Sequence, residues 1–207
     1  KRSNSLPPYF FKRRGVFVKQ LESLLRHKIP DIKLTMFGST VTGIVTKDSD
    51  VDISASGASI DSPRSQLEAL VEIREWLRQN NIITVLINAR VPILQFKRTK
   101  SFSFYVHAFD LCIGNEAAIN NSKYIASIVK YDDRIKTLAS VIKRWAKESK
   151  LLNSSKGFTS YALSLLTIFF CCSTQLVPWV KPHPRPKWPP KGPPNTKSIS
   201  RLLFEFF

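Results

Sequence analysis

Two aspartates separated by one residue lie in residues 36–54, which read MFGSTVTGIVTKDSDVDIS. Side chains alternate between the two faces of a strand, so Asp50 and Asp52 would point the same way while Val51 and Ile53 point into a core. Two carboxylates on one rigid element are hard oxygen ligands, which suit Mg²⁺ together with substrate phosphates. The stretch therefore predicts a cation site, and its ordinary alternative is an exposed polar strand face.

A Gly-Ser turn precedes these aspartates and follows a short apolar run, residues 34–37, that predicts a strand. Gly38 lacks a Cβ, and Ser39 carries a hydroxyl donor. The turn could therefore approach phosphate oxygens closely.

A third aspartate lies in a later stretch with strand character. Residues 101–113 alternate in polarity, and this phase places Asp110 on the same face as Phe102 and Phe104. A carboxylate on an apolar face needs a partner, because an unpaired buried charge is costly. A metal ion would supply that partner, whereas an aspartate that emerges into solvent at a strand end would need none.

The combination of FGS at residues 37–39, Gly43 and SDVDI at residues 49–53 resembles the signature of the polymerase-beta-like nucleotidyltransferase superfamily. Within it, the chain resembles the template-independent terminal RNA nucleotidyltransferases, which include non-canonical poly(A) polymerases and RNA uridylyltransferases. The resemblance spans about residues 16–172 and resumes in SISRLLFEFF at residues 198–207.

The resemblance implies catalytic and metal-binding roles for three carboxylates: Asp50, Asp52 and Asp110. They would hold two Mg²⁺ or Mn²⁺ ions. It also implies nucleotide-binding roles for a second set of residues: Gly38, Ser39, Asn121, Ser122, Lys143, Lys147, Ser160 and Tyr161.

Two short motifs carry the nucleotide-binding roles of Lys143, Lys147, Ser160 and Tyr161. Lys143 and Lys147, in VIKRWAK, are four residues apart and would share one helical face, where they resemble the family's triphosphate-binding pair. GFTSYAL resembles the motif whose serine binds phosphate and whose tyrosine stacks on the base, although Thr159 replaces a serine. A solvated lysine pair and a core tyrosine are the ordinary alternatives.

The expected fold is α+β: a mixed β-sheet nucleotidyltransferase domain flanked by helices, plus a mostly helical poly(A)-polymerase-associated domain that is truncated here. We expect a basic N-terminal arm, a catalytic domain, and a helical domain that includes a Pro-rich connector. The ranges are 1–15 for the arm, 30–115 for the catalytic domain, 16–29 and 116–207 for the helical domain, and 178–194 for the connector.

Charge is the outstanding feature of the composition. The chain has 32 Lys and Arg against 15 Asp and Glu, a formal net charge of +17, which predicts a polyanionic partner such as nucleic acid.

Its longest apolar run, residues 161–172, is too short to span a bilayer, so we expect no membrane association. Cys112, Cys171 and Cys172 lack metal-ligand spacing and are expected to be buried thiols of a reducing compartment.

The resemblance implies an enzyme that adds UMP or AMP from UTP or ATP to an RNA 3′-hydroxyl by two-metal catalysis. The alternatives are a catalytically silent RNA-binding or assembly factor of the same fold, and a nucleotidyltransferase that acts on a small molecule or a protein. We expect an RNA 3′ end as partner, with protein partners in an RNA-processing complex. The compartment is expected to be intracellular, mitochondrial before cytoplasmic, and the absence of an initial methionine suggests a processed product or a fragment.

Overall fold

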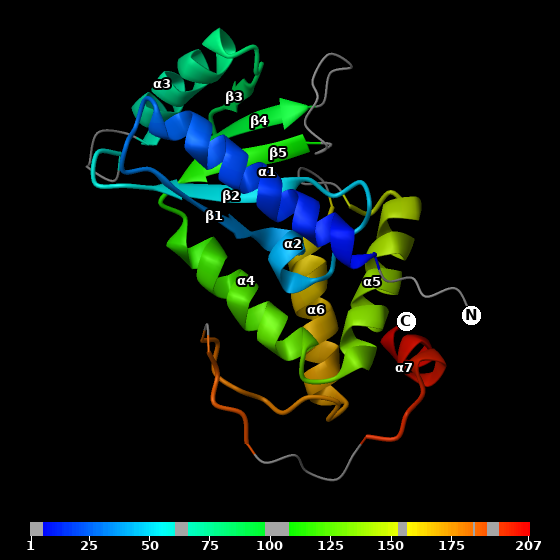
Figure 1. Ribbon diagram of the computed structural model, residues 1–207. Coiled ribbons are helices and arrows are strands. Elements are labelled where there is room, and N and C mark those ends of the chain that lie inside the picture. The colour runs from blue at the N-terminus through cyan, green and yellow to red at the C-terminus, as the bar shows by residue number, and fades with distance from the viewer. Residues whose placement is uncertain (1–5, 61–65, 98–107, 153–156, 184, 190–194) are drawn as a thin grey trace. The chain divides into compact units, whose positions relative to one another are not determined.

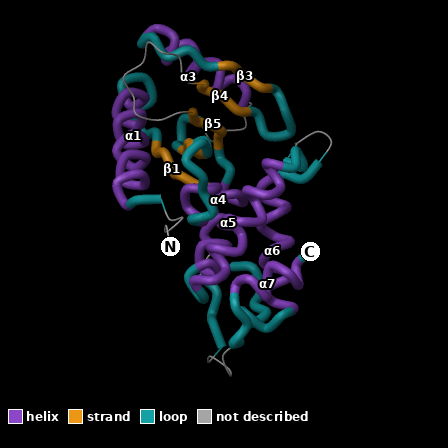
Figure 2. Tube along the Cα trace, turned by 90° about the vertical axis from the view of Figure 1, so that its right-hand side faces the viewer, coloured by secondary structure: helices purple, strands orange, loops and turns teal. Residues whose placement is uncertain are grey.

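The computed structural model describes residues 6–60, 66–97, 108–152, 157–183, 185–189 and 195–207. Helices and strands follow one another along these ranges (Figures 1 and 2). In chain order they are α1 (Pro8–Arg26), β1 (Lys33–Phe37), α2 (Gly38–Thr42), β2 (Val51–Ser56), α3 (Gln66–Gln79), β3 (Val85–Ile87), β4 (Ile93–Lys97), β5 (Ala108–Ile113), α4 (Glu116–Val129), α5 (Asp133–Glu148), α6 (Ser160–Ser173) and α7 (Ile199–Phe206).

The chain forms two compact units. One, the sheet unit, contains residues 5–41 and 47–119, and the other, the helical unit, contains residues 42–46 and 120–207. The chain passes from the sheet unit to the helical unit between residues 119 and 120.

The sheet unit is built on a five-stranded sheet with the order β1-β2-β5-β4-β3. β2 and β5 are parallel, and the other neighbouring pairs are antiparallel. This confirms the predicted mixed sheet. Strands β4 and β3 complete the sheet beyond β5, and residues 101–107 of the stretch expected to be a strand lie outside the described residues.

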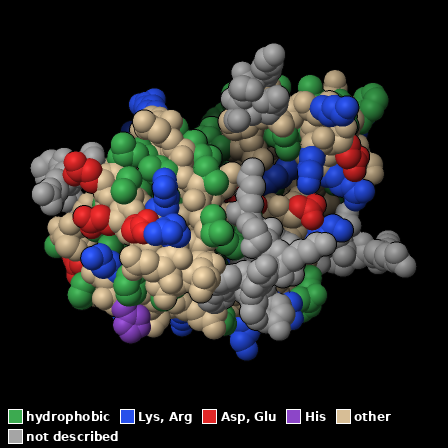
Figure 3. All heavy atoms as spheres, turned by 90° about the horizontal axis from the view of Figure 1, so that it is seen from above, with side chains coloured by type: hydrophobic (Ala, Val, Ile, Leu, Met, Phe, Trp, Pro, Cys, Tyr) green, Lys and Arg blue, Asp and Glu red, His purple; other side chains and the backbone are tan. Residues whose placement is uncertain are grey.

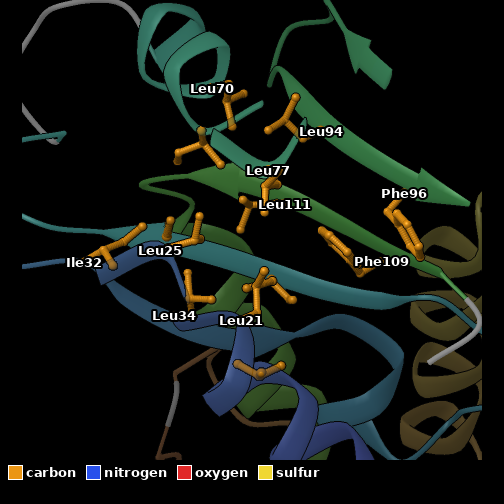
Figure 4. Close-up of a cluster of buried hydrophobic side chains, with 14 of the residues drawn as sticks. Leu21, Leu25, Ile32, Leu34, Leu70, Leu77, Leu94, Phe96, Phe109 and Leu111 are labelled. Carbon is orange, nitrogen blue, oxygen red and sulfur yellow. The ribbon is translucent and has the colours of Figure 1, made fainter. Parts of the chain in front are cut away.

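One hydrophobic core holds the sheet unit together (Figure 4). Leu21 and Leu25 of α1, Leu77 of α3 and Leu111 of β5 are at most 2% exposed. Full burial of a leucine side chain contributes about 1.5–3 kcal/mol. Helix α1 therefore belongs to the sheet unit by its packing.

The structure corrects two predictions about the N-terminal region. Residues 1–15 were expected to form a basic arm, yet α1 begins at Pro8, because proline in the first helical turn needs no hydrogen bond from its nitrogen. Residues 16–29 were assigned to the helical domain, but Phe17 and Val18 are buried in the core of the sheet unit.

The helical unit has a core of its own, to which α4, α5, α6 and α7 contribute. Its helices begin at capping side chains: the Asp132 carboxylate accepts a hydrogen bond from the Arg134 amide, and the Thr159 hydroxyl accepts one from the Ala162 amide. The described part of the Pro-rich connector forms neither helix nor strand, as predicted. The Tyr124 hydroxyl donates to the Val180 carbonyl, which holds the start of the connector on α4.

None of the helices in the described ranges combines the length and the apolar character that crossing a bilayer requires.

Candidate active site

Two of the predicted carboxylates stand on neighbouring strands. Asp52 of β2 and Asp110 of β5 are partners in the parallel register. Neighbouring strands lie about 4.8 Å apart, so side chains that are paired across them stand side by side on one face. Both residues are half-buried, while Val51, Ile53, Phe109 and Leu111 beside them are buried. The register of β2 and β5 thus brings together two of the three carboxylates that the family resemblance implied.

Asp50 lies one residue before the first residue of β2 and is also half-buried. Within the described part of the chain, no three side chains of His, Cys, Asp or Glu are grouped so that they could hold one ion. Mg²⁺ usually takes one or two carboxylates and completes its shell with water and substrate phosphates. The pair formed by Asp52 and Asp110 fits that requirement, and a ligand role for Asp50 stays a prediction.

The Gly-Ser turn borders the same carboxylates. Gly38 has a φ of +64°, and a Cβ added to it would lie 2.0 Å from Oδ2 and 2.7 Å from Cγ of Asp52. Only glycine fits there, because the conformation is strained for other residues and the space is taken by the Asp52 carboxylate. Ser39 follows within α2 and is half-buried. Main chain, hydroxyl and carboxylate are therefore adjacent, as a site for a phosphate and a cation requires.

Gln95 is a site residue that the sequence analysis missed. It is the partner of Asp110 in the antiparallel register of β4 and β5, and its Nε2 donates a hydrogen bond to Asp110 Oδ1 at 3.2 Å. An amide donor favours the ionised form of a carboxylate and restricts its rotation. The signal in the sequence is a polar residue on a strand between the buried Leu94 and Phe96.

Arg14 is the second missed residue. It comes from α1, is only 5% exposed, and donates hydrogen bonds to the Thr40 hydroxyl and to the main-chain carbonyls of Ser49 and Asp50. Burial lowers the pKa of its guanidinium, and the charges of Asp52 and Asp50 oppose that shift. Its place in a run of basic residues made it look like part of a solvated arm.

The predicted lysine pair lies on α5 of the helical unit. Lys143 is half-buried, and its Nζ donates to the Ile44 carbonyl at 3.2 Å, whereas Lys147 is exposed. Their spacing of four residues in a continuous helix puts both on one face.

Ser160 and Tyr161 occupy the first turn of α6, directly after the capping residue Thr159. Both are exposed, and Tyr161 keeps 47% of its surface accessible. The tyrosine is thus no core residue, and its ring is available to a ligand. The departure from the family motif at Thr159 is harmless to the helix, because a threonine hydroxyl caps it as a serine would.

The two predicted nucleotide-binding residues on α4 differ in their exposure. Asn121 is exposed, but Ser122 is 5% exposed because it lies on the face of α4 that also carries the buried Ile125 and Val129. Of this pair, only Asn121 offers its side chain to a ligand. Its convergence with Lys143, Lys147, Ser160 and Tyr161 on one nucleotide stays a prediction.

Residues 2–130 of this 207-residue chain match the family described as the central palm domain of poly(A) RNA polymerase, mitochondrial-like. The chain belongs to this palm-domain family. Its membership agrees with the mixed sheet and with the two aspartates that β2 and β5 bring together.

Curated relatives of this palm-domain chain include enzymes of both expected specificities. Poly(A) RNA polymerase cid11 of Schizosaccharomyces pombe is 32% identical over 164 residues, which are 76% of this chain and 33% of the relative. Terminal uridylyltransferase cid1 of the same organism is 28% identical over 163 residues, which are 77% of this chain and 40% of the relative. The chain thus spans a third to two fifths of the length of these relatives.

A solved structure of a Cid1 poly(U) polymerase variant bound to MgATP is similar in fold to this palm-domain chain. The TM-score is 0.75 at 25% identity, and the match covers 98% of this chain and 68% of the other.

Proposed function

We propose that this chain is the catalytic region of an RNA 3′-terminal nucleotidyltransferase, which transfers UMP or AMP from the nucleoside triphosphate to an RNA 3′-hydroxyl. The observation that carries the proposal is the register pairing of Asp52 with Asp110, beside a glycine turn that only glycine can form. Membership of the palm-domain family supports the reaction class.

Asp52 and Asp110 would hold the divalent cation, with Asp50 as the predicted third ligand of a two-ion site. Bound Mg²⁺ or Mn²⁺ would lower the pKa of the RNA 3′-hydroxyl and neutralise charge on the phosphates. Gln95 would orient the Asp110 carboxylate through its hydrogen bond.

The remaining polar groups would bind the nucleotide. Gly38 and Ser39 would donate main-chain N–H and hydroxyl hydrogen bonds to phosphate oxygens, and Lys143 and Lys147 would neutralise the triphosphate. The exposed ring of Tyr161 would stack on the base. Because every base has a π face, that contact binds UTP and ATP alike and does not choose between them.

RNA would be bound mainly through its phosphates. The chain has a formal charge of +17, and on the face shown in Figure 3 the Lys and Arg side chains are spread among hydrophobic and acidic ones. Spread charge attracts a backbone without reading its sequence, so RNA affinity should fall steeply as salt rises.

The test is to offer ATP, UTP, GTP and CTP separately to the full-length protein with a short RNA primer and Mg²⁺ or Mn²⁺. We expect extension of the primer with UTP or ATP. Salt-sensitive RNA binding without extension by any nucleotide would instead identify a catalytically silent RNA-binding factor.

A further inference from the structure

The guanidinium of Arg14 lies in an unusual place for a residue of a basic segment. It is 5% exposed, and its Cζ is 4.3 Å from the centroid of the Phe10 ring on the preceding turn of α1. A buried charge is costly unless it is paired and hydrogen-bonded, so a structure retains one only where its contacts compensate.

Those contacts join helix α2 to the segment before β2 in the proposed site. Nη1 donates to Thr40 Oγ1 at 2.6 Å, two residues after Gly38, and also to the Asp50 carbonyl at 3.1 Å. Nη2 donates to the Ser49 carbonyl. The planar fork of arginine can bind several oxygens at once in a fixed geometry, which the ammonium of lysine cannot.

The same guanidinium lies within electrostatic reach of Asp50 and Asp52. It therefore acts on the carboxylates in two opposite ways. Its hydrogen bonds hold the main chain that carries Asp50, which favours cation binding, whereas its positive charge repels a divalent cation.

We propose that Arg14 is a positioning residue, whose fork fixes the Gly38 turn and the segment before β2 so that the carboxylates of Asp50 and Asp52 are preset for a divalent cation. Its consequence for catalysis rests on the proposed function, but its effect on cation binding does not. Because the two actions of the guanidinium oppose each other, the direction in which its removal changes the Kd for a divalent cation shows which action dominates.

The experiment is a titration of the full-length protein with Mn²⁺ in the absence of nucleotide and RNA. Electron paramagnetic resonance monitors the free Mn²⁺ and so gives the Kd for the ion. Arg14→Gln should raise the Kd for Mn²⁺ about tenfold, as is typical when a residue that supports metal ligands is lost. Arg14→Lys should raise it at least as much, because it keeps the repelling charge but loses the fork. The control, Arg13→Gln, removes an equal charge from the neighbouring exposed position of α1 and should leave the Kd within about twofold.

A second variant covers the case in which Arg14→Gln does not fold. Thr40→Val removes the hydroxyl acceptor with almost no change of shape, leaves the charge in place, and should raise the Kd in the same direction by a smaller factor. Thermal unfolding of each variant without metal separates loss of fold from loss of cation affinity.

Three outcomes would overturn the proposal: unchanged or tighter Mn²⁺ binding by Arg14→Gln, full rescue by Arg14→Lys, or a wild-type protein that binds no Mn²⁺. A wild-type protein that binds Mn²⁺ but extends no primer would refute the proposed function alone, and the Kd values would still decide the role of Arg14.

Discussion

The two units hold their functional side chains in different ways. Asp52 and Asp110 are half-buried on paired strands, where main-chain hydrogen bonds set their register and Gln95 and Gly38 contact them. Lys147 and Tyr161 instead stand exposed on helices. Short side chains on a sheet are preorganised before any ligand arrives, whereas long exposed ones are ordered by the ligand at an entropic cost. Changes in the sheet unit should therefore abolish chemistry, and changes in the helical unit should weaken substrate binding.

The largest effect is expected for the paired aspartates. Asp110→Asn and Asp52→Asn each keep the side-chain shape but remove a charge that a cation needs, so the rate of nucleotide addition should fall by about 10³-fold or more. Primer extension measures it, and circular dichroism checks the fold. The control is Asp48→Asn, an exposed position in the loop before β2, which should keep its rate. Incorporation by Asp110→Asn at a wild-type rate would remove that carboxylate from the mechanism.

Gly38→Ala should come next, with addition reduced about a hundredfold. Alanine at a φ of +64° costs about 1–2 kcal/mol of backbone strain, and its Cβ would displace the Asp52 carboxylate. Gly114→Ala is a matched control in the same unit: its φ is +63°, but the nearest atom to an added Cβ is Gln66 Nε2 at 3.6 Å. Chemical denaturation should show a lower free energy of unfolding in both variants, because both place alanine at a positive φ. Only Gly38→Ala should lose activity. Equal loss of activity in both would attribute the effect to backbone strain.

A smaller, different effect is expected in the helical unit. Lys147→Ala should raise the KM for the nucleoside triphosphate about tenfold with little change in kcat, because one charge-assisted contact is lost. Arg144→Ala removes a nearby cation of α5 that is already paired with Glu148, and it should leave both constants unchanged. A fall in kcat without a change in KM would mean that this lysine acts in the chemical step. That result would contradict the expectation that changes in the helical unit weaken only substrate binding.

The smallest effect on activity is expected from chemical labelling of the buried cysteines. The order in which they are labelled also compares the stability of the two units. Burial raises the pKa of Cys112 and Cys172, and raises that of Cys171 to about 12. At pH 8 a thiol with that pKa is ionised in about one molecule in 10⁴, so iodoacetamide should label the native protein very slowly and leave activity intact. Mass spectrometry would then show whether Cys112, in the sheet unit, or Cys171, in the helical unit, is labelled first and hence which unit opens more readily. Rapid labelling of all three without denaturant would contradict their burial.

The resemblance of the motifs to a known family was sufficient to predict the mixed sheet and a shared site for Asp52 and Asp110. Alternation along each strand, which is a local signal, predicted only which side chains share a face. It did not predict Arg14 or Gln95, since Arg14 bonds to residues 26 to 36 positions away and Gln95 to one 15 positions away. Such contacts depend on strand order and helix packing, which no local pattern encodes. Burial of Ser122 was missed for the same reason, because it follows from the face that α4 turns to its core.

The most direct test of the central claim is a crystal structure of the full-length protein with Mn²⁺ and a non-hydrolysable nucleoside triphosphate, phased to locate the metal by its anomalous signal. The account predicts an anomalous peak within coordination distance of carboxylate oxygens of both Asp52 and Asp110. A nucleotide bound with Mn²⁺ elsewhere, and with neither carboxylate touching the metal, would contradict it.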